Sequence, residues 1–216
     1  NIVFSTSPGA TPVAEAAHIS ANANMWRMSD DFSDQWQLLR EAFDLCSRWQ
    51  GVGGPGHWPD ADMLPLGRLN LCSPKGRTTG KPSNFTRDEQ ITLMTLWSIF
   101  KSPLIFGGHL PDNDDWTFSL LTNPDILDMH KNGFDPVESR NTNGDEVESI
   151  VWKSKGRHGA EYVALFNVSD GPLTVSEPMT PNKKIKELWD NRDYQTSGSE
   201  ISSNIPPHGA RVFKLS

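Results

Sequence analysis

The chain has 216 residues, enough for one large domain or two small ones with a real core. Its 27 acidic residues outnumber 20 basic ones, and the formal net charge of −7 argues against nucleic acid or an anionic membrane surface as a partner. No apolar run approaches the roughly 20 residues of a membrane-spanning helix, so we expect no membrane span. Two cysteines, Cys46 and Cys72, are too few for a disulfide framework, and whether they pair stays open.

Short apolar runs alternate with longer amphipathic ones from the first residue to about residue 132, a pattern typical of β/α units around a parallel sheet. In chain order we expect a strand at 2–5, a helix at 12–22, a strand at 24–29, a helix at 33–49, a strand end at 63–66, a polar loop at 67–84, a helix at 86–100, a strand at 104–107 and two short helices within 116–129. About four β/α units make half of an eight-stranded barrel. Because the chain opens on Asn1 and enters a strand at once, we expect further residues upstream.

The pattern changes after residue 132 to short strands separated by turn residues. The expected strands are 149–153, 162–167, 173–176, 186–189 and 210–215. Their regular spacing predicts an antiparallel β-domain. The sequence therefore predicts two domains, residues 1–132 and residues 133–216.

Three blocks carry a resemblance to a known family. Residues 24–31, Asn-Met-Trp-Arg-Met-Ser-Asp-Asp, with Trp36 ten positions after the first tryptophan, resemble the sixth-strand signature of family 27 α-galactosidases and α-N-acetylgalactosaminidases. Residues 54–64, Gly-Pro-Gly-His-Trp-Pro-Asp-Ala-Asp-Met-Leu, are similar to that family's seventh-strand segment, and Pro-Pro-His-Gly-Ala-Arg at 206–211 is typical of its last domain. The resemblance implies an α/β fold: the second half of a (β/α)8 TIM barrel, about strands 5 to 8, followed by a C-terminal antiparallel β-sandwich.

The resemblance also implies roles for particular side chains. Asp31 matches the acid/base of a retaining glycoside hydrolase, in which two carboxyl groups lie about 5 Å apart. Arg27 matches the arginine that hydrogen-bonds sugar hydroxyls, while Asp62 and Met63 match residues that line the pocket. Trp26 and Trp58, at strand ends, are candidates for stacking on a sugar ring.

Other interpretations of the acidic residues stay open. Asp30 and Asp31 could instead cap the helix that follows them, since aspartate satisfies free N–H groups at a helix start. His57, Asp60 and Asp62 could suggest metal ligands, but no fourth candidate stands at a fixed spacing, so we expect no metal. The resemblance implies no cofactor.

The nucleophile expected of this family has no counterpart in the chain. The family places it in a lysine-x-aspartate segment at the end of the fourth strand, and no lysine precedes Gln50 here. We therefore expect that this chain alone cannot complete a two-step hydrolysis. The alternative function is a catalytically inactive fragment or a carbohydrate-binding protein.

Ser7 and Ala10 bear on the choice of sugar. They match the serine and alanine with which the family's α-N-acetylgalactosaminidases make room for an N-acetyl group, although Pro8 replaces the tryptophan expected there. The expected partner is thus a terminal α-galactoside or α-N-acetylgalactosaminide of a glycan. A half barrel would leave apolar sheet edges uncovered, which predicts poor solubility and allows a homo-oligomer. Family resemblance points to a secreted, periplasmic or lysosomal location without choosing among them.

Overall fold

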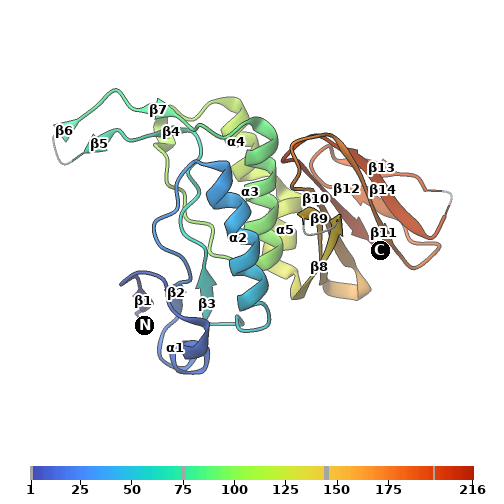
Figure 1. The fold of residues 1–216 in the computed structure, drawn as a ribbon, viewed down its shortest axis with the longest axis horizontal. Helices are drawn as coiled ribbons and strands as arrows, with labels where there is room; N and C mark the ends of the chain where they lie inside the picture. The colour runs from blue at the N-terminus through green and yellow to red at the C-terminus, as the bar shows by residue number, and fades with distance from the viewer. Residues whose placement is uncertain (1, 74–75, 144–145, 197) are drawn as a thin grey trace. The chain divides into compact units, whose positions relative to one another are not determined.

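The computed structural model describes residues 2–73, 76–143, 146–196 and 198–216 (Figure 1). These residues form two compact units. The first unit contains the chain as far as Thr86 and the segment Lys101–Thr122, and the second contains Arg87–Phe100 and Asn123–Ser216.

The first unit is built around a parallel sheet in which β2 lies between β1 and β3. Its strands are β1 (Ser5–Thr6), β2 (Met25–Arg27) and β3 (Trp58–Asp60). A short 3-10 turn, η1 (Val13–Glu15), and helix α1 (Ala16–Asn22) link β1 to β2, and α2 (Trp36–Trp49) links β2 to β3. This strand–helix–strand order with parallel pairing confirms the β/α units expected from the sequence.

Helix α2 packs against the sheet through one apolar stripe. Its buried residues recur at spacings of three or four and are Leu39, Ala42, Phe43, Cys46 and Trp49. The ring of Trp49 lies 5.7 Å from that of Trp26 on β2, which fixes the helix to the neighbouring strand. The helix begins at Trp36, three residues later than the sequence predicts, after Gln35 in extended conformation.

Two sequence expectations in the first unit are wrong. The segment 67–84 is not a plain loop but holds two short ribbons, β4 (Arg68–Leu69) with β7 (Lys81–Pro82) and β5 (Cys72–Ser73) with β6 (Gly76–Arg77). The strand expected at 104–107 is reduced to a single parallel bridge between Leu64 and Phe106. The next donor that a longer ladder would use, the Leu66 N–H, turns back to the Leu64 carbonyl oxygen at 2.9 Å, so the pairing ends there. The turn η2 (Leu110–Asp112) and helix α4 (Asp115–Thr122) complete the unit.

The second unit contains a six-stranded antiparallel sheet in the order β13-β12-β15-β10-β9-β8, together with a two-stranded sheet of β11 and β14. Its strands are β8 (Phe134–Asn143), β9 (Glu146–Lys155), β10 (Glu161–Asn167), β11 (Leu173–Pro178), β12 (Ile185–Glu187), β13 (Arg192–Tyr194), β14 (Glu200–Ile205) and β15 (Ala210–Leu215), with a 3-10 turn η3 (Arg157–Gly159) between β9 and β10. All five strands expected from the sequence are present, and β8, β13 and β14 are additional.

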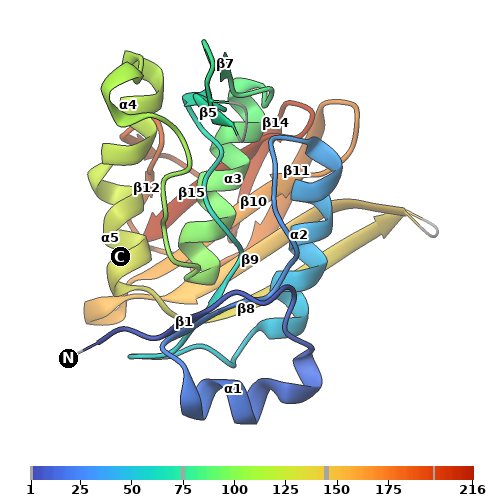
Figure 2. The same ribbon diagram turned by 90° about the vertical axis from the view of Figure 1, so that its left-hand side faces the viewer.

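The two faces of the six-stranded sheet bury different partners. One face packs on the small sheet through an aliphatic and aromatic core that includes Val151, Val163, Leu165, Val175, Ile201 and Phe213. The other face carries α3 (Arg87–Phe100) and α5 (Pro124–Asn132), as Figure 2 shows. Phe100 of α3 meets Trp152 of β9 edge to face at 5.9 Å. The unit is therefore a layered α/β-sandwich rather than a sheet pair alone.

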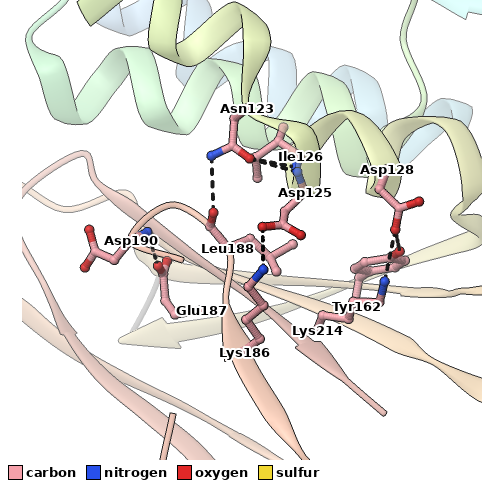
Figure 3. Close-up of polar contacts among 10 residues, drawn as sticks. All are labelled: Asn123, Asp125, Ile126, Asp128, Tyr162, Lys186, Glu187, Leu188, Asp190 and Lys214. Atoms are coloured by element: carbon pink, nitrogen blue, oxygen red, sulfur yellow. Dashed lines mark hydrogen bonds and ion pairs between the residues drawn. The ribbon is translucent and has the colours of Figure 1, made fainter. Parts of the chain in front are cut away.

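Polar contacts attach α5 to the sheet (Figure 3). Lys186 of β12 reaches Asp125 at 2.7 Å. Asp128 accepts hydrogen bonds from the Tyr162 hydroxyl at 2.9 Å and from Lys214 at 3.0 Å. Burial alone would raise the pKa of Asp128, but these hydrogen bonds and one from Asn132 lower it.

Helix α3 is tied to the turn before β15 and to the segment after β12. His208 contacts Glu89 at 2.8 Å, and the Thr92 hydroxyl donates to the His208 carbonyl oxygen at 2.6 Å. The Trp189 indole N–H donates to the Thr95 hydroxyl at 2.9 Å. A boundary between residues 132 and 133 stays a prediction, and α3 and α5 lie in the same compact unit as the strands.

Candidate active site

The carboxyl ends of β1, β2 and β3 bring together the residues that the sequence motifs single out. Because the strands are parallel and Arg27 stands opposite Asp60 in the β2–β3 register, the segments that leave these strands emerge on the same edge of the sheet. In a β/α barrel this edge carries the active site.

Arg27 is the centre of the polar network at this edge. Its Nη2 donates to the carbonyl oxygen of Asp30 at 2.6 Å and lies 2.7 Å from Oδ2 of Asp62. Its Nη1 lies 3.7 Å from Oδ1 of Asp31. The side chains of Arg27 and Asp62 are 11% and 12% exposed, whereas the Asp31 carboxylate is fully exposed. The structure thus places a buried ion pair directly behind a carboxylate that is open to solvent.

Asp62 has an unusual backbone conformation. Its φ of +82° lies in the left-handed region, which costs a residue with a side chain about 1–2 kcal/mol. Its carboxylate accepts hydrogen bonds from the Phe32 N–H through Oδ2 and from its own neighbour's N–H, that of Met63, through Oδ1, both at 2.7 Å. These bonds and the Arg27 pair hold the turn in place.

Asp60, the last residue of β3, is a part of this network for which the sequence suggested only a metal-binding role. The residue is 4% exposed, and its Oδ1 accepts a hydrogen bond from the Asp62 N–H at 3.0 Å. Burial raises the pKa of its carboxyl group above the usual value; the hydrogen bond from the Asp62 N–H lowers it in part, the charge of Asp62 raises it, and the charge of Arg27 lowers it. The β2–β3 register, which the sequence does not specify, puts Asp60 beside Arg27.

The loop after β1 lies beside the end of β2. The Thr11 N–H donates to the Arg27 carbonyl oxygen at 3.0 Å, and the Ala10 N–H donates to Oδ1 of Asp30 at 3.3 Å. Ser7 in this loop is exposed, as is Met63, which follows Asp62. Ser7, Ala10 and Met63 therefore lie on segments that leave the same strand ends as Arg27.

Trp26 is not brought to this group. It is fully buried and faces Trp49 of α2, because neighbouring residues on a strand point to opposite faces and Arg27 takes the other one. Trp58, at the start of β3, lies at the opposite end of the strand from Asp60. The capping alternative also fails, since α2 begins at Trp36 and its N-cap residue makes no side-chain hydrogen bond to the helix.

Asp31 also borders a pocket of about 330 Å³ beside α2. Apolar side chains such as Met28, Phe32, Leu38 and Ala42 contribute most of its lining. Among the residues that the structure describes, no three His, Cys, Asp or Glu side chains are grouped so as to hold a metal ion. Nor does any helix in the described ranges have the length and apolarity to cross a bilayer.

Comparison with known families matches both parts of the chain. A family model described as alpha galactosidase A matches residues 4–132, and one described as the alpha galactosidase C-terminal beta sandwich domain matches residues 146–215. The chain therefore belongs to the α-galactosidase family of glycoside hydrolases, family 27. It corresponds to the latter half of that family's (β/α)8 barrel and to the C-terminal β-sandwich.

Relatives of known sequence support the same assignment. Alpha-galactosidase 2 of Arabidopsis thaliana is 24% identical over 204 residues, which cover 89% of this chain and 46% of the relative. The α-galactosidase of Cyamopsis tetragonoloba is 24% identical over 201 residues, which cover 89% of this chain and 44% of the relative. The chain thus spans a little under half the length of these two relatives.

Solved structures add more similar proteins. A family 27 β-L-arabinopyranosidase from Geobacillus stearothermophilus is 43% identical, with a TM-score of 0.91 over 99% of this chain and 49% of that one. A protein from Bacillus halodurans, provisionally described as an α-N-acetylgalactosaminidase, is 35% identical, with a TM-score of 0.79 over 97% of this chain and 48% of its own.

Proposed function

We propose that the whole protein is a retaining exo-glycosidase that removes terminal α-D-galactosyl or α-N-acetylgalactosaminyl residues, and that Asp31 is its acid/base. The observation that supports this most is the arrangement at the strand ends, where Arg27 joins Asp62 at 2.7 Å and faces the exposed Asp31 at 3.7 Å. Family membership supports glycoside hydrolysis as the chemistry.

In this mechanism a carboxylate outside the chain attacks the anomeric carbon while Asp31 gives its proton to the departing glycosidic oxygen. In the second step Asp31 takes a proton from water, which attacks the same carbon and releases the sugar. Arg27, Asp62 and Met63 contact the sugar. We assign no nucleophile within this chain.

The sugar itself has a second candidate. β-L-Arabinopyranose has the ring hydroxyl configuration of α-D-galactose and lacks only the hydroxymethyl group on carbon 5. The 43% identity to a β-L-arabinopyranosidase favours this substrate beside the two galacto sugars. The small side chains of Ser7 and Ala10 favour extra space at the 2-position, which suits the N-acetyl sugar.

Hydrolysis of three p-nitrophenyl glycosides by the whole protein tests the choice. The glycosides are the α-galactoside, the α-N-acetylgalactosaminide and the β-L-arabinopyranoside, and the highest kcat/KM identifies the substrate. A preference for either sugar with a free 2-hydroxyl would contradict the Ser7 and Ala10 inference. Failure to cleave any of them would favour an inactive or carbohydrate-binding protein.

Replacement of Asp31 tests the acid/base. Asp31→Ala should lower kcat/KM by about 10²- to 10⁴-fold, the usual contribution of general acid–base catalysis. On an aryl glycoside with a good leaving group, added azide should restore turnover and give a glycosyl azide of retained anomeric configuration, because azide attacks without a general base. Asp193→Ala, the same change at an exposed residue of β13, is the matched control and should leave kcat/KM unchanged. Retained activity in Asp31→Ala would refute the assignment.

A further inference from the structure

The turn after β3 contains Asp62, which forms the ion pair with Arg27 and also has a strained backbone. Asp62 has a φ of +82°, and from this turn its carboxylate reaches Arg27 and the Phe32 N–H, both at 2.7 Å. An aspartate enters the left-handed region more easily than most residues, but its surroundings must still hold it there.

Asp60 supplies that constraint from inside the sheet. It is 4% exposed, and its Oδ1 accepts the Asp62 N–H at 3.0 Å, a side-chain-to-backbone bond across two residues that closes the turn. Its own backbone is fixed by the ladder, since its carbonyl oxygen accepts the Met28 N–H at 2.9 Å. The acceptor is therefore attached to rigid structure.

We propose that Asp60 is a positioning residue: it holds Asp62 in the left-handed turn so that Asp62 aims Arg27 at the acid/base Asp31. This inference rests on the proposed function of Asp31. The links run from Asp60 to the Asp62 N–H at 3.0 Å, from Asp62 to Arg27 at 2.7 Å and from Arg27 to Asp31 at 3.7 Å.

The role needs an oxygen acceptor at Asp60, not a negative charge. Burial and the neighbouring charge of Asp62 raise the pKa of the Asp60 carboxyl group, whereas the Asp62 N–H bond and the charge of Arg27 lower it, so the geometry of the bond and not a net charge is what the turn requires. A carboxamide of the same shape presents the same acceptor oxygen without that charge. Replacement of Asp60 by asparagine should therefore cost little activity, whereas replacement by alanine should cost much more.

The test compares Asp60→Asn and Asp60→Ala in the whole protein, with kcat/KM measured on aryl glycosides of graded leaving-group ability. For Asp60→Ala, kcat/KM should fall about 10- to 100-fold on glycosides with poor leaving groups, a loss typical of a displaced catalytic group. The loss should shrink on the dinitrophenyl glycoside, whose departure needs little acid assistance. Asp60→Asn should stay within about threefold of wild type on all substrates, since its acceptor is retained.

The outcomes separate this inference from the proposed function. If the wild type cleaves none of the glycosides, the proposed function fails, and the positioning role that rests on it fails with it. If the wild type is active and Asp60→Asn loses as much as Asp31→Ala, or Asp60→Ala loses the same factor on every leaving group, the positioning role is refuted. Should Asp60→Ala fail to fold in a thermal melt, the asparagine variant alone decides.

Discussion

Arg27 binds two groups with one nitrogen, Nη2, and faces a third with Nη1, which only a planar fork can do. Arg27→Lys keeps the charge but offers one compact ammonium group. We expect kcat/KM of the whole protein to fall about 100-fold, in line with a misplaced binding group. Steady-state kinetics on the preferred glycoside measure the loss.

Arg40→Lys, at an exposed position of α2, is the control for the change of residue type and should have no effect. Activity of Arg27→Lys within a factor of three of wild type would show that charge alone suffices at this position.

Some of this network could be predicted from single residues and some could not. The motifs around Arg27, Asp31 and Asp62 pointed to a common strand end; the register pairs Arg27 with Asp60, and the turn after Asp60 brings Asp62 to within 2.7 Å of Arg27. Strand alternation could have excluded Trp26, because it neighbours Arg27 and must face the other way. The left-handed turn at Asp62 has no sequence signal, since no glycine marks it.

At the scale of elements, the attachment of α5 depends on an ionised Asp128. Since its pKa is lowered in the folded chain, the carboxylate stabilises the fold at neutral pH, and this contribution is lost as the pH falls below about 4. Asp128→Asn should lower the free energy of unfolding at pH 7 by about 1 kcal/mol, a modest value because solvent reaches the site. Thermal unfolding measured from pH 7 to pH 3 should show the difference shrink with acidification.

Asp135→Asn provides the matched control, because the Asp135–Lys155 pair on the same unit is well exposed at 62% and 67%. Asparagine also tolerates the φ of +50° at this position. Equal destabilisation by the two substitutions would contradict the role given to Asp128, and so would a loss of stability in Asp128→Asn that persists at pH 3.

Helices were predicted better than strands, for a physical reason. The apolar stripe of α2 repeats over 14 residues, whereas β13 is three residues long and β14 carries two serines and an asparagine. Strand β8 contains Pro136 and charged residues, which are common on sheet edges, and its position as the edge strand explains them. Such strands are specified by their neighbours more than by their own sequence.

For the molecule as a whole, we expect the β1 edge of the parallel sheet to be a site of association in the 216-residue chain. Ile2, Val3 and Phe4, which precede β1 at this edge, are 93%, 74% and 55% exposed. We expect the 216-residue chain alone to self-associate with increasing concentration, because an open edge and an apolar strip can both pair with another chain. The double substitution of Ile2 and Val3 by lysine should reduce association, measured by sedimentation velocity.

Leu110→Lys is the control for added charge, since Leu110 is 66% exposed but lies in an isolated turn. An equal reduction in association from this change would show that net charge, and not the sheet edge, governs association.

The contacts of α3 matter for anyone who recombines this protein with a relative. A chimaera joined between residues 132 and 133 would keep the native α3 and give it a foreign sandwich, although Glu89, Thr92 and Thr95 each bond to partners beyond the junction. The helix face and the residues His208 and Trp189 would have to be exchanged together. The segments that must be exchanged together are therefore not contiguous in the sequence.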